Sequence, residues 1–202
     1  ELCKKLVSFE GMTLSDMQWI GIATPGIVKD GKVIYANNLG WQNAEFAKIM
    51  QEKTGRPVII ANDANTAAYA EAIWGVGAES RTLVAVTLGT GVGGAVVMDS
   101  RIMRGRNNRA GEIGHFVIDR NGPECECGLH GCLERYVSAT ALIESVEKAV
   151  SEHPESILAQ VAKDGVNGKT AFDAKEKGCE IASRVLDEYG RSLAIGLDCL
   201  AH

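Results

Sequence analysis

The segment GEIGHFVIDRNGPECECGLHGCLE, residues 111–134, gathers side chains of the kinds that bind metal ions. His115, Cys125, Cys127 and Cys132 offer one imidazole and three thiolates, which is the ligand set of a closed tetrahedral zinc site. Glycines between them supply the tight turns that a chelating loop requires. The residue types therefore predict a structural zinc loop.

The spacing of these residues leaves alternatives open. C-x-C-x4-C differs from the common C-x2-C knuckle, and His130 stands as close in sequence to the cysteines as a fourth ligand needs to be. A redox pair or a set of reduced free thiols would use the same cysteines without a metal. The spacing alone does not choose between His115 and His130.

A glycine-rich stretch, TLGTGVGG at residues 87–94, joins two apolar β-branched segments. Backbone without side chains can present several N–H groups to a phosphate at such a turn. The stretch lacks the lysine and hydroxyl ending of a Walker loop and leads into a strand, so neither the Walker nor the dinucleotide pattern applies. A tight hairpin without a ligand is the alternative interpretation.

Asn62 and Asp63 stand where an apolar strand gives way to an alanine-rich helix. Polar residues there either cap the helix or face a crevice that holds a ligand. Two adjacent polar residues are more than one cap requires, and Asp63 is the carboxylate at this corner. A carboxylate in a crevice could act as a general base toward an alcohol.

Composition and charge limit the kinds of molecule that this protein is expected to bind. The net charge of −5 gives no long-range attraction for nucleic acid or anionic lipid. No apolar run approaches the roughly 18 residues of a membrane span, so we expect a cytoplasmic protein that does not enter a membrane. A zinc-dependent nucleic-acid module is a rival hypothesis, which four arginines preceding the loop would support: Arg101, Arg104, Arg106 and Arg109. Acidic side chains within the loop argue against phosphate contact there.

The pattern of elements predicts an α/β protein with mixed sheets. Apolar strands with turn signals, including a hairpin at Asp30-Gly31, fill the first part of the chain. We predict helices over residues 43–54, from residue 62, over 133–153, over 154–163 and from residue 170 onward. The strand-to-helix change near Ala61 suggests two lobes, residues 1–61 and 62–202.

Six motifs together resemble the ROK family of bacterial sugar kinases and sugar-responsive repressors, in order and spacing over essentially the whole chain. The chain is most similar to the ATP-dependent glucokinase branch. The motifs are GIATPG, NNLGW, ANDANTAAYAE, LGTGVGG, GEIGH and CECGLHGCLE. The resemblance implies a fold of the actin and hexokinase type, related to ribonuclease H, with two lobes closing over sugar and ATP.

The resemblance also implies roles for individual residues. Asp63 would be the catalytic base that deprotonates the 6-hydroxyl of a hexose, glucose first among the candidates. The implied sugar ligands are Asn38, Asn62, Asp63, Glu112, His115 and Glu134. The implied zinc ligands are His115, Cys125, Cys127 and Cys132. Thr87, Gly89, Thr90, Gly91 and Gly93 would hold the phosphates of ATP, with Mg²⁺ as the companion ion. The resemblance thereby prefers His115 over His130.

Departures from the family pattern are informative as well. The family's first phosphate hairpin, Asp-x-Gly-x-Thr, and its C-terminal adenosine-binding glycines do not occur in this sequence. The chain starts at Glu1 without methionine and stops at His202 inside a helical pattern. We therefore expect a piece of a longer protein, truncated at both ends, which functions as a homo-oligomer, most simply a dimer. A kinase for N-acetylmannosamine or fructose and a sugar-sensing repressor are the alternatives.

Overall fold

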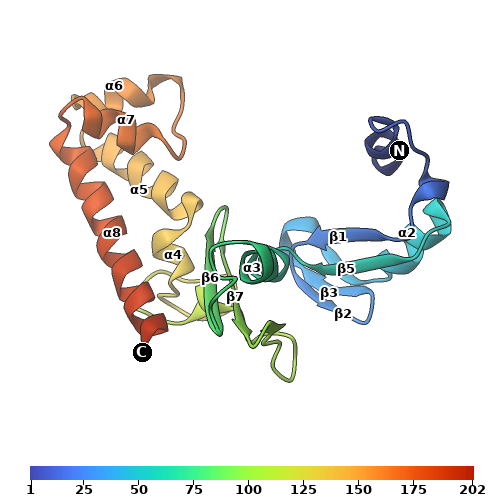
Figure 1. The fold of residues 1–202 in the computed structure, drawn as a ribbon. Coiled ribbons are helices and arrows are strands. Elements are labelled where there is room, and N and C mark those ends of the chain that lie inside the picture. The colour runs from blue at the N-terminus through green and yellow to red at the C-terminus, as the bar shows by residue number, and fades with distance from the viewer. The chain divides into compact units, whose positions relative to one another are not determined.

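The computed structural model describes the backbone of residues 1–202 and every side chain except that of Asn37. Figure 1 shows strands interspersed with helices in the first half of the chain and mainly helices in the second. The strands are β1 (Ile20–Thr24), β2 (Ile27–Lys29), β3 (Lys32–Ala36), β4 (Trp41–Ala44), β5 (Val58–Asn62), β6 (Thr82–Leu88), β7 (Val92–Met98) and β8 (Arg101–Ile102). The helices are α1 (Leu2–Ser8), α2 (Phe46–Thr54), α3 (Asp63–Trp74), α4 (Glu134–Val137), α5 (Ala139–Glu152), α6 (Ile157–Val161), α7 (Thr170–Glu176) and α8 (Glu180–Ala201). Short 3-10 turns are η1 (Leu14–Asp16), η2 (Asn37–Leu39), η3 (Ile113–His115) and η4 (Ala162–Asp164).

The contacts divide the chain into two compact units. The first unit holds residues 1–83 and 96–111, and the second holds residues 84–95 and 112–202. The predicted lobe boundary near Ala61 lies inside the first unit. The third sheet has the order β6-β7-β8.

In the first unit, β1 and β5 form a parallel pair whose register sets Thr24 beside Asn62. The antiparallel order β2-β3-β4 makes a second sheet. Buried apolar side chains of its core come from β3, α2 and β5: Val33, Ala36, Ala47 and Ile60. Helix α3 starts directly at the carboxyl end of β5, so Asp63 lies at a strand end.

The hairpin predicted at Asp30-Gly31 is confirmed. Strands β2 and β3 pair in antiparallel fashion, and Asp30 and Gly31 have φ angles of 50° and 77°. Two consecutive left-handed residues are what a two-residue type I′ turn requires, and aspartate and glycine tolerate them best. The turn therefore sets the register of this sheet.

The helix predicted over residues 43–54 begins later than its apolar spacing indicated. Asn43 and Ala44 belong to β4, where Ala44 pairs with Val33 of β3. Pairing with a neighbouring strand thus overrides helical spacing at this end. The other end is as predicted, because Gly55 has a φ of 67° and closes α2 in the left-handed conformation.

The helices of the second unit pack together (Figure 1), and α8 contacts α4, α5 and α7. Its core contains Leu142, Val146, Leu158, Ala174 and Leu186, among other buried apolar residues. Contacts with α8 therefore hold α5 and also α4, the helix that follows the cysteine loop.

The single helix predicted over residues 133–153 is wrong, because it breaks at Ser138. This residue has a ψ of 160°, and its hydroxyl accepts a hydrogen bond from the Ala141 backbone N–H at 3.0 Å. A serine that caps a new helix competes with helix continuation. Ser156 likewise caps α6, so the helix predicted over 154–163 starts at Ile157 and ends in η4.

Candidate functional site

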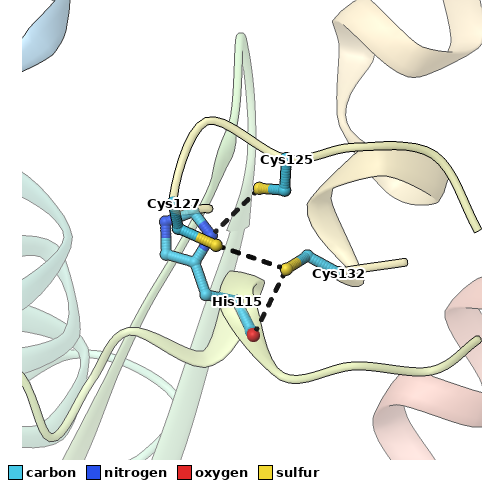
Figure 2. Close-up of side chains that lie close together, drawn as sticks. All are labelled: His115, Cys125, Cys127 and Cys132. Atoms are coloured by element: carbon cyan, nitrogen blue, oxygen red, sulfur yellow. Dashed lines mark hydrogen bonds between the residues drawn. The ribbon is translucent and has the colours of Figure 1, made fainter. Parts of the chain in front are cut away.

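Four side chains of kinds that can bind a metal ion converge in the second unit (Figure 2). One donor atom from each of His115, Cys125, Cys127 and Cys132 lies within 4.8 Å of the other three. Cys125 Sγ is 3.5 Å from His115 Nδ1, and Cys127 Sγ is 3.5 Å from Cys132 Sγ. His130 is not a member of this group, whose histidine is His115.

The spacing and the donor types suit a zinc ion. Ligands about 2.0 to 2.3 Å from zinc lie roughly 3.5 to 3.8 Å apart at the corners of a tetrahedron. Two donor separations in the cluster, 3.5 Å each, match this value. Four protein donors fill the coordination sphere, so an ion held here would be structural.

The three thiols of the cluster differ in how readily they ionise. Burial raises the pKa of the Cys132 thiol to about 12 and raises that of Cys125. Burial opposes ionisation of Cys127 too, but hydrogen bonds from the Leu129 backbone and from the neighbouring thiols bring its pKa below the ordinary value. Buried Cys125 and Cys132 thus ionise readily only beside a positive charge.

Backbone hydrogen bonds shape the loop around this cluster. The N–H of Cys125 donates to Leu129 O at 2.8 Å, and the N–H of Gly128 donates to Cys125 O at 2.9 Å. Gly128 and Gly131 have φ angles of 88° and 67°, which side chains rarely adopt. A Cβ on Gly131 would also overlap the carbonyl of Asp119. The loop glycines are therefore required by conformation.

The loop leads directly into α4. Cys132 pairs with Val117 in an isolated antiparallel bridge, and Leu133 N donates to Phe116 O at 3.0 Å. Leu133 is almost completely buried and packs against Gly196 of α8, where a Cβ would come within 2.7 Å of its Cδ1. Glu134, the first residue of α4, therefore follows Cys132 of the cluster by only two positions.

Glu134 connects this region to the glycine turn between β6 and β7. Its Oε2 accepts a hydrogen bond from the backbone N–H of Val92 at 2.7 Å. A Cβ on Gly91 would overlap the same carboxylate oxygen. The glycine at this position thus makes room for Glu134.

The η3 turn, which carries the GEIGH motif, lies against the same hairpin. A Cβ on Gly114 would overlap Val92 O, and a Cβ on Gly94 would overlap Ile113. Glu112 precedes the turn with an exposed side chain, and its carbonyl accepts from His115 N at 3.1 Å. The structure therefore brings His115, Glu134 and the glycine turn into one region of the second unit.

The remaining turn residues predicted for phosphate binding are accessible. Thr87, Gly89 and Thr90 are exposed, whereas Gly91 and Gly93 are partly buried. A Cβ on Gly89 would meet open space, in contrast to Gly91. The glycines of this stretch consequently serve different purposes, which the sequence pattern does not distinguish.

Asn62 and Asp63 lie in the first unit, with Asn38. The Asn62 side chain caps α3 by accepting from Asn65 N at 2.9 Å, and its Nδ2 donates to Gly26 O at 3.1 Å. Asp63 is exposed, and its Oδ1 accepts from Ala64 N at 2.8 Å. Asn38 is an exposed residue of η2. The capping interpretation of Asn62 is confirmed, and Asp63 keeps its Oδ2 without a hydrogen bond among the described residues.

The arginines proposed for a nucleic-acid module lie in the first unit, whereas the cysteine cluster lies in the second. All four arginines are exposed.

The contacts missed by sequence reasoning involve Val92, Ala139 and Thr140, which touch Glu134 or the glycine turn. Ser138 is a sequence signal for the start of a helix, because serine is a favoured capping residue. Nothing in the sequence pattern indicates the contacts across to Gly89 and Thr90.

Comparison with known proteins identifies the family. The profile of the ROK family matches residues 2–201, so this chain belongs to the ROK family. A glucokinase of Halalkalibacterium halodurans is 38% identical over 203 aligned positions, covering 98% of this chain and 62% of that protein. The xylose repressor of Bacillus subtilis is 39% identical over 129 positions, covering 63% of this chain and 34% of the repressor.

A solved structure supports the same assignment. The crystal structure of a ROK family glucokinase from Streptomyces griseus in complex with glucose and AMPPNP matches with a TM-score of 0.82 and 30% identity, covering 98% of this chain and 67% of that one. The fold is therefore the α/β fold of the actin and hexokinase type that the motifs imply. The chain spans 62% and 58% of the lengths of the glucokinases from H. halodurans and Thermotoga maritima. Across the described residues, no helix has both the length and the apolar character to cross a membrane.

Proposed function

We propose that the protein carrying this chain is an ATP-dependent hexose kinase that converts glucose to glucose 6-phosphate. The observation that carries the proposal is the contact between Glu134, an implied sugar ligand, and Val92 at the edge of the glycine turn. This contact links Glu134, which is suited to bind a sugar hydroxyl, to the glycine turn, whose backbone is suited to bind phosphate. The 38% identity to a glucokinase supports glucose as the acceptor.

In the proposed reaction, the 6-hydroxyl oxygen of the sugar attacks the γ-phosphorus of ATP while Asp63 takes its proton. The bond between the γ-phosphorus and the bridging oxygen breaks, and ADP leaves. Such transfer asks the protein mainly for positioning and for stabilisation of charge. Backbone N–H groups of the turn, whose candidate residues are Thr87, Gly89, Thr90, Gly91 and Gly93, would hold phosphate oxygens. Mg²⁺ would neutralise charge on the nucleotide.

The sugar would be held by carboxylates and amides that accept and donate hydrogen bonds to its hydroxyls. Glu134 is suited to this because Oε2 is occupied by Val92 while Oε1 has no hydrogen bond among the described residues. His115 is suited because Nδ1 faces the cysteines, which leaves Nε2 for a hydroxyl. Asn38, Asn62 and Glu112 complete the proposed set.

We propose that zinc, held by His115 and the three cysteines, fixes the loop that presents these residues. An imidazole bound at one nitrogen has a set tautomer and orientation for a contact at the other. The chain's own residues would otherwise have to hold three thiols and an imidazole together by hydrogen bonds alone. We further propose a homo-oligomer in the cytoplasm.

A sugar-sensing repressor is the second candidate, favoured by the 39% identity to the xylose repressor. A repressor needs the sugar and zinc residues but no phosphoryl transfer. The two functions are separated by measuring ADP release with ATP and Mg²⁺ on glucose, mannose, fructose, xylose and N-acetylmannosamine. We expect release with glucose; binding of a sugar without ADP release from any of the five would reject the kinase in favour of the repressor.

A further inference from the structure

Two hydrogen bonds from the start of α5 hold two successive carbonyls of the glycine turn. The backbone N–H of Ala139 donates to Gly89 O at 2.8 Å. The hydroxyl of Thr140 donates to Thr90 O, also at 2.8 Å. The turn is thus fastened to a helix of 14 residues whose inner face is packed in the core.

These two bonds determine where the next two N–H groups point. Each carbonyl shares a planar trans peptide with the N–H of the following residue, and the two bonds of such a unit point in opposite directions. No peptide bond among the described residues is cis. Because Gly89 O and Thr90 O face α5, the N–H groups of Thr90 and Gly91 face away from it.

Neither of these N–H groups has a hydrogen-bond partner among the described residues, whereas their neighbours in the turn are satisfied. Gly89 N donates to Gly91 O at 2.9 Å, and Val92 N donates to Glu134. Thr90 is exposed and Gly91 is partly exposed, so a ligand can reach the pair. Two adjacent, fixed backbone donors form the kind of concavity that binds a phosphate oxygen.

We propose that Thr140 is a positioning residue for the nucleotide phosphates: its hydroxyl holds the Thr90 carbonyl so that the Thr90 and Gly91 N–H groups present a preformed anion site. The inference rests on the proposed kinase function and adds to it a residue outside the turn itself. Thr140 touches neither sugar nor nucleotide in this role. It orders the turn before the nucleotide binds, so that nucleotide binding loses less conformational entropy.

The contact between Glu134 and Val92 has a different consequence from the Thr140 contact. Glu134 serves the sugar side and the turn together, so its loss would disturb both substrates. Thr140 contacts the turn alone through its hydroxyl. A change at Thr140 should therefore affect ATP and leave the sugar unaffected.

The test is steady-state kinetics of the complete protein with ATP and glucose as varied substrates. Thr140→Val keeps the shape of the side chain and removes the donor, and we expect the KM for ATP to rise about threefold to tenfold, the range for one neutral hydrogen bond. The KM for glucose and the melting temperature should stay at their wild-type values. Thr140→Ser keeps the hydroxyl and should restore the KM for ATP.

Ser145→Ala is the matched control, since Ser145 Oγ donates to the carbonyl of Ala141 within α5 at 2.8 Å and touches no part of the turn. It should leave both KM values unchanged. An unchanged KM for ATP in Thr140→Val, or an equal rise in both KM values, would overturn the positioning role while wild-type turnover preserves the kinase. A wild-type protein that neither binds AMPPNP nor releases ADP would overturn both.

Discussion

The carboxylate of Glu134 accepts a hydrogen bond from the backbone N–H of Val92 at 2.7 Å, joining the end of the cysteine loop to the glycine turn. A buried or half-buried carboxylate with a backbone donor is held in one orientation, because charge-assisted hydrogen bonds are about twice as strong as neutral ones. The opposite oxygen is then presented in a fixed direction. Under the proposed function, this contact would make the position of the turn a determinant of sugar binding.

Gly91→Ala should weaken glucose binding, because the added Cβ would overlap Glu134 Oε2 and displace the carboxylate. We expect the Kd for glucose, measured by isothermal titration calorimetry, to rise about tenfold, which corresponds to loss of one hydrogen bond to a charged group. Gly89→Ala is the control two residues away, where the Cβ meets open space. Equal affinities in both variants would show that Gly91 does not make room for a sugar ligand.

Cys127→Ser should remove zinc and sugar affinity together. Loss of one thiolate from a four-ligand site lowers metal affinity steeply, and the loop that carries His115 and leads to Glu134 loses its crosslink. Zinc content would be measured by mass spectrometry and glucose binding by calorimetry. Cys199→Ser, at an exposed cysteine of α8 outside the cluster, serves as control and should keep both. A Cys127 variant that binds glucose normally without zinc would show that the metal does not organise the sugar site.

Zinc binding should release protons and weaken as the pH falls. Burial holds the pKa of Cys132 at about 12 and that of Cys125 above its ordinary value, so both thiols carry protons near pH 7 before the metal displaces them. The metal-free state thus binds more protons than the zinc-bound state, and acid favours it. Calorimetry in buffers of different ionisation enthalpy should report net proton release on zinc binding at pH 7. Zinc binding without proton release would contradict the assignment of these cysteines as ligands.

Local signals in the sequence anticipated much of this arrangement. Asp30-Gly31 specifies its hairpin because few residues tolerate two positive φ angles, and Gly55 ends its helix for a similar reason. The ligand types His115, Cys125, Cys127 and Cys132 identified the cluster, because clustered thiols and an imidazole have few other uses in one loop. Only the identity of the histidine needed the family resemblance.

Contacts between segments distant in the sequence could not be anticipated. The break at Ser138 is different, because a serine cap is a local signal that the sequence does contain. The sequence TLGTGVGG does not show that its glycines have different roles. Gly91 and Gly94 make room for Glu134 and Ile113, whereas Gly89 faces open space. Such differences depend on which element packs against the turn, and local residue propensities do not reveal that element.

The most direct test of the proposed function is transfer of the γ-phosphoryl group from ATP to glucose, followed by ³¹P NMR, with wild-type protein and Asp63→Asn. We predict glucose 6-phosphate with the wild type, and a rate at least about 100-fold lower with the variant, because a positioned general base contributes factors of about 10² to 10⁴. Glucose binding should persist in the variant, since asparagine retains the shape and an oxygen acceptor. A wild-type protein that binds glucose and ATP yet forms no sugar phosphate would contradict the proposed kinase, and equal rates in both proteins would contradict the role of Asp63.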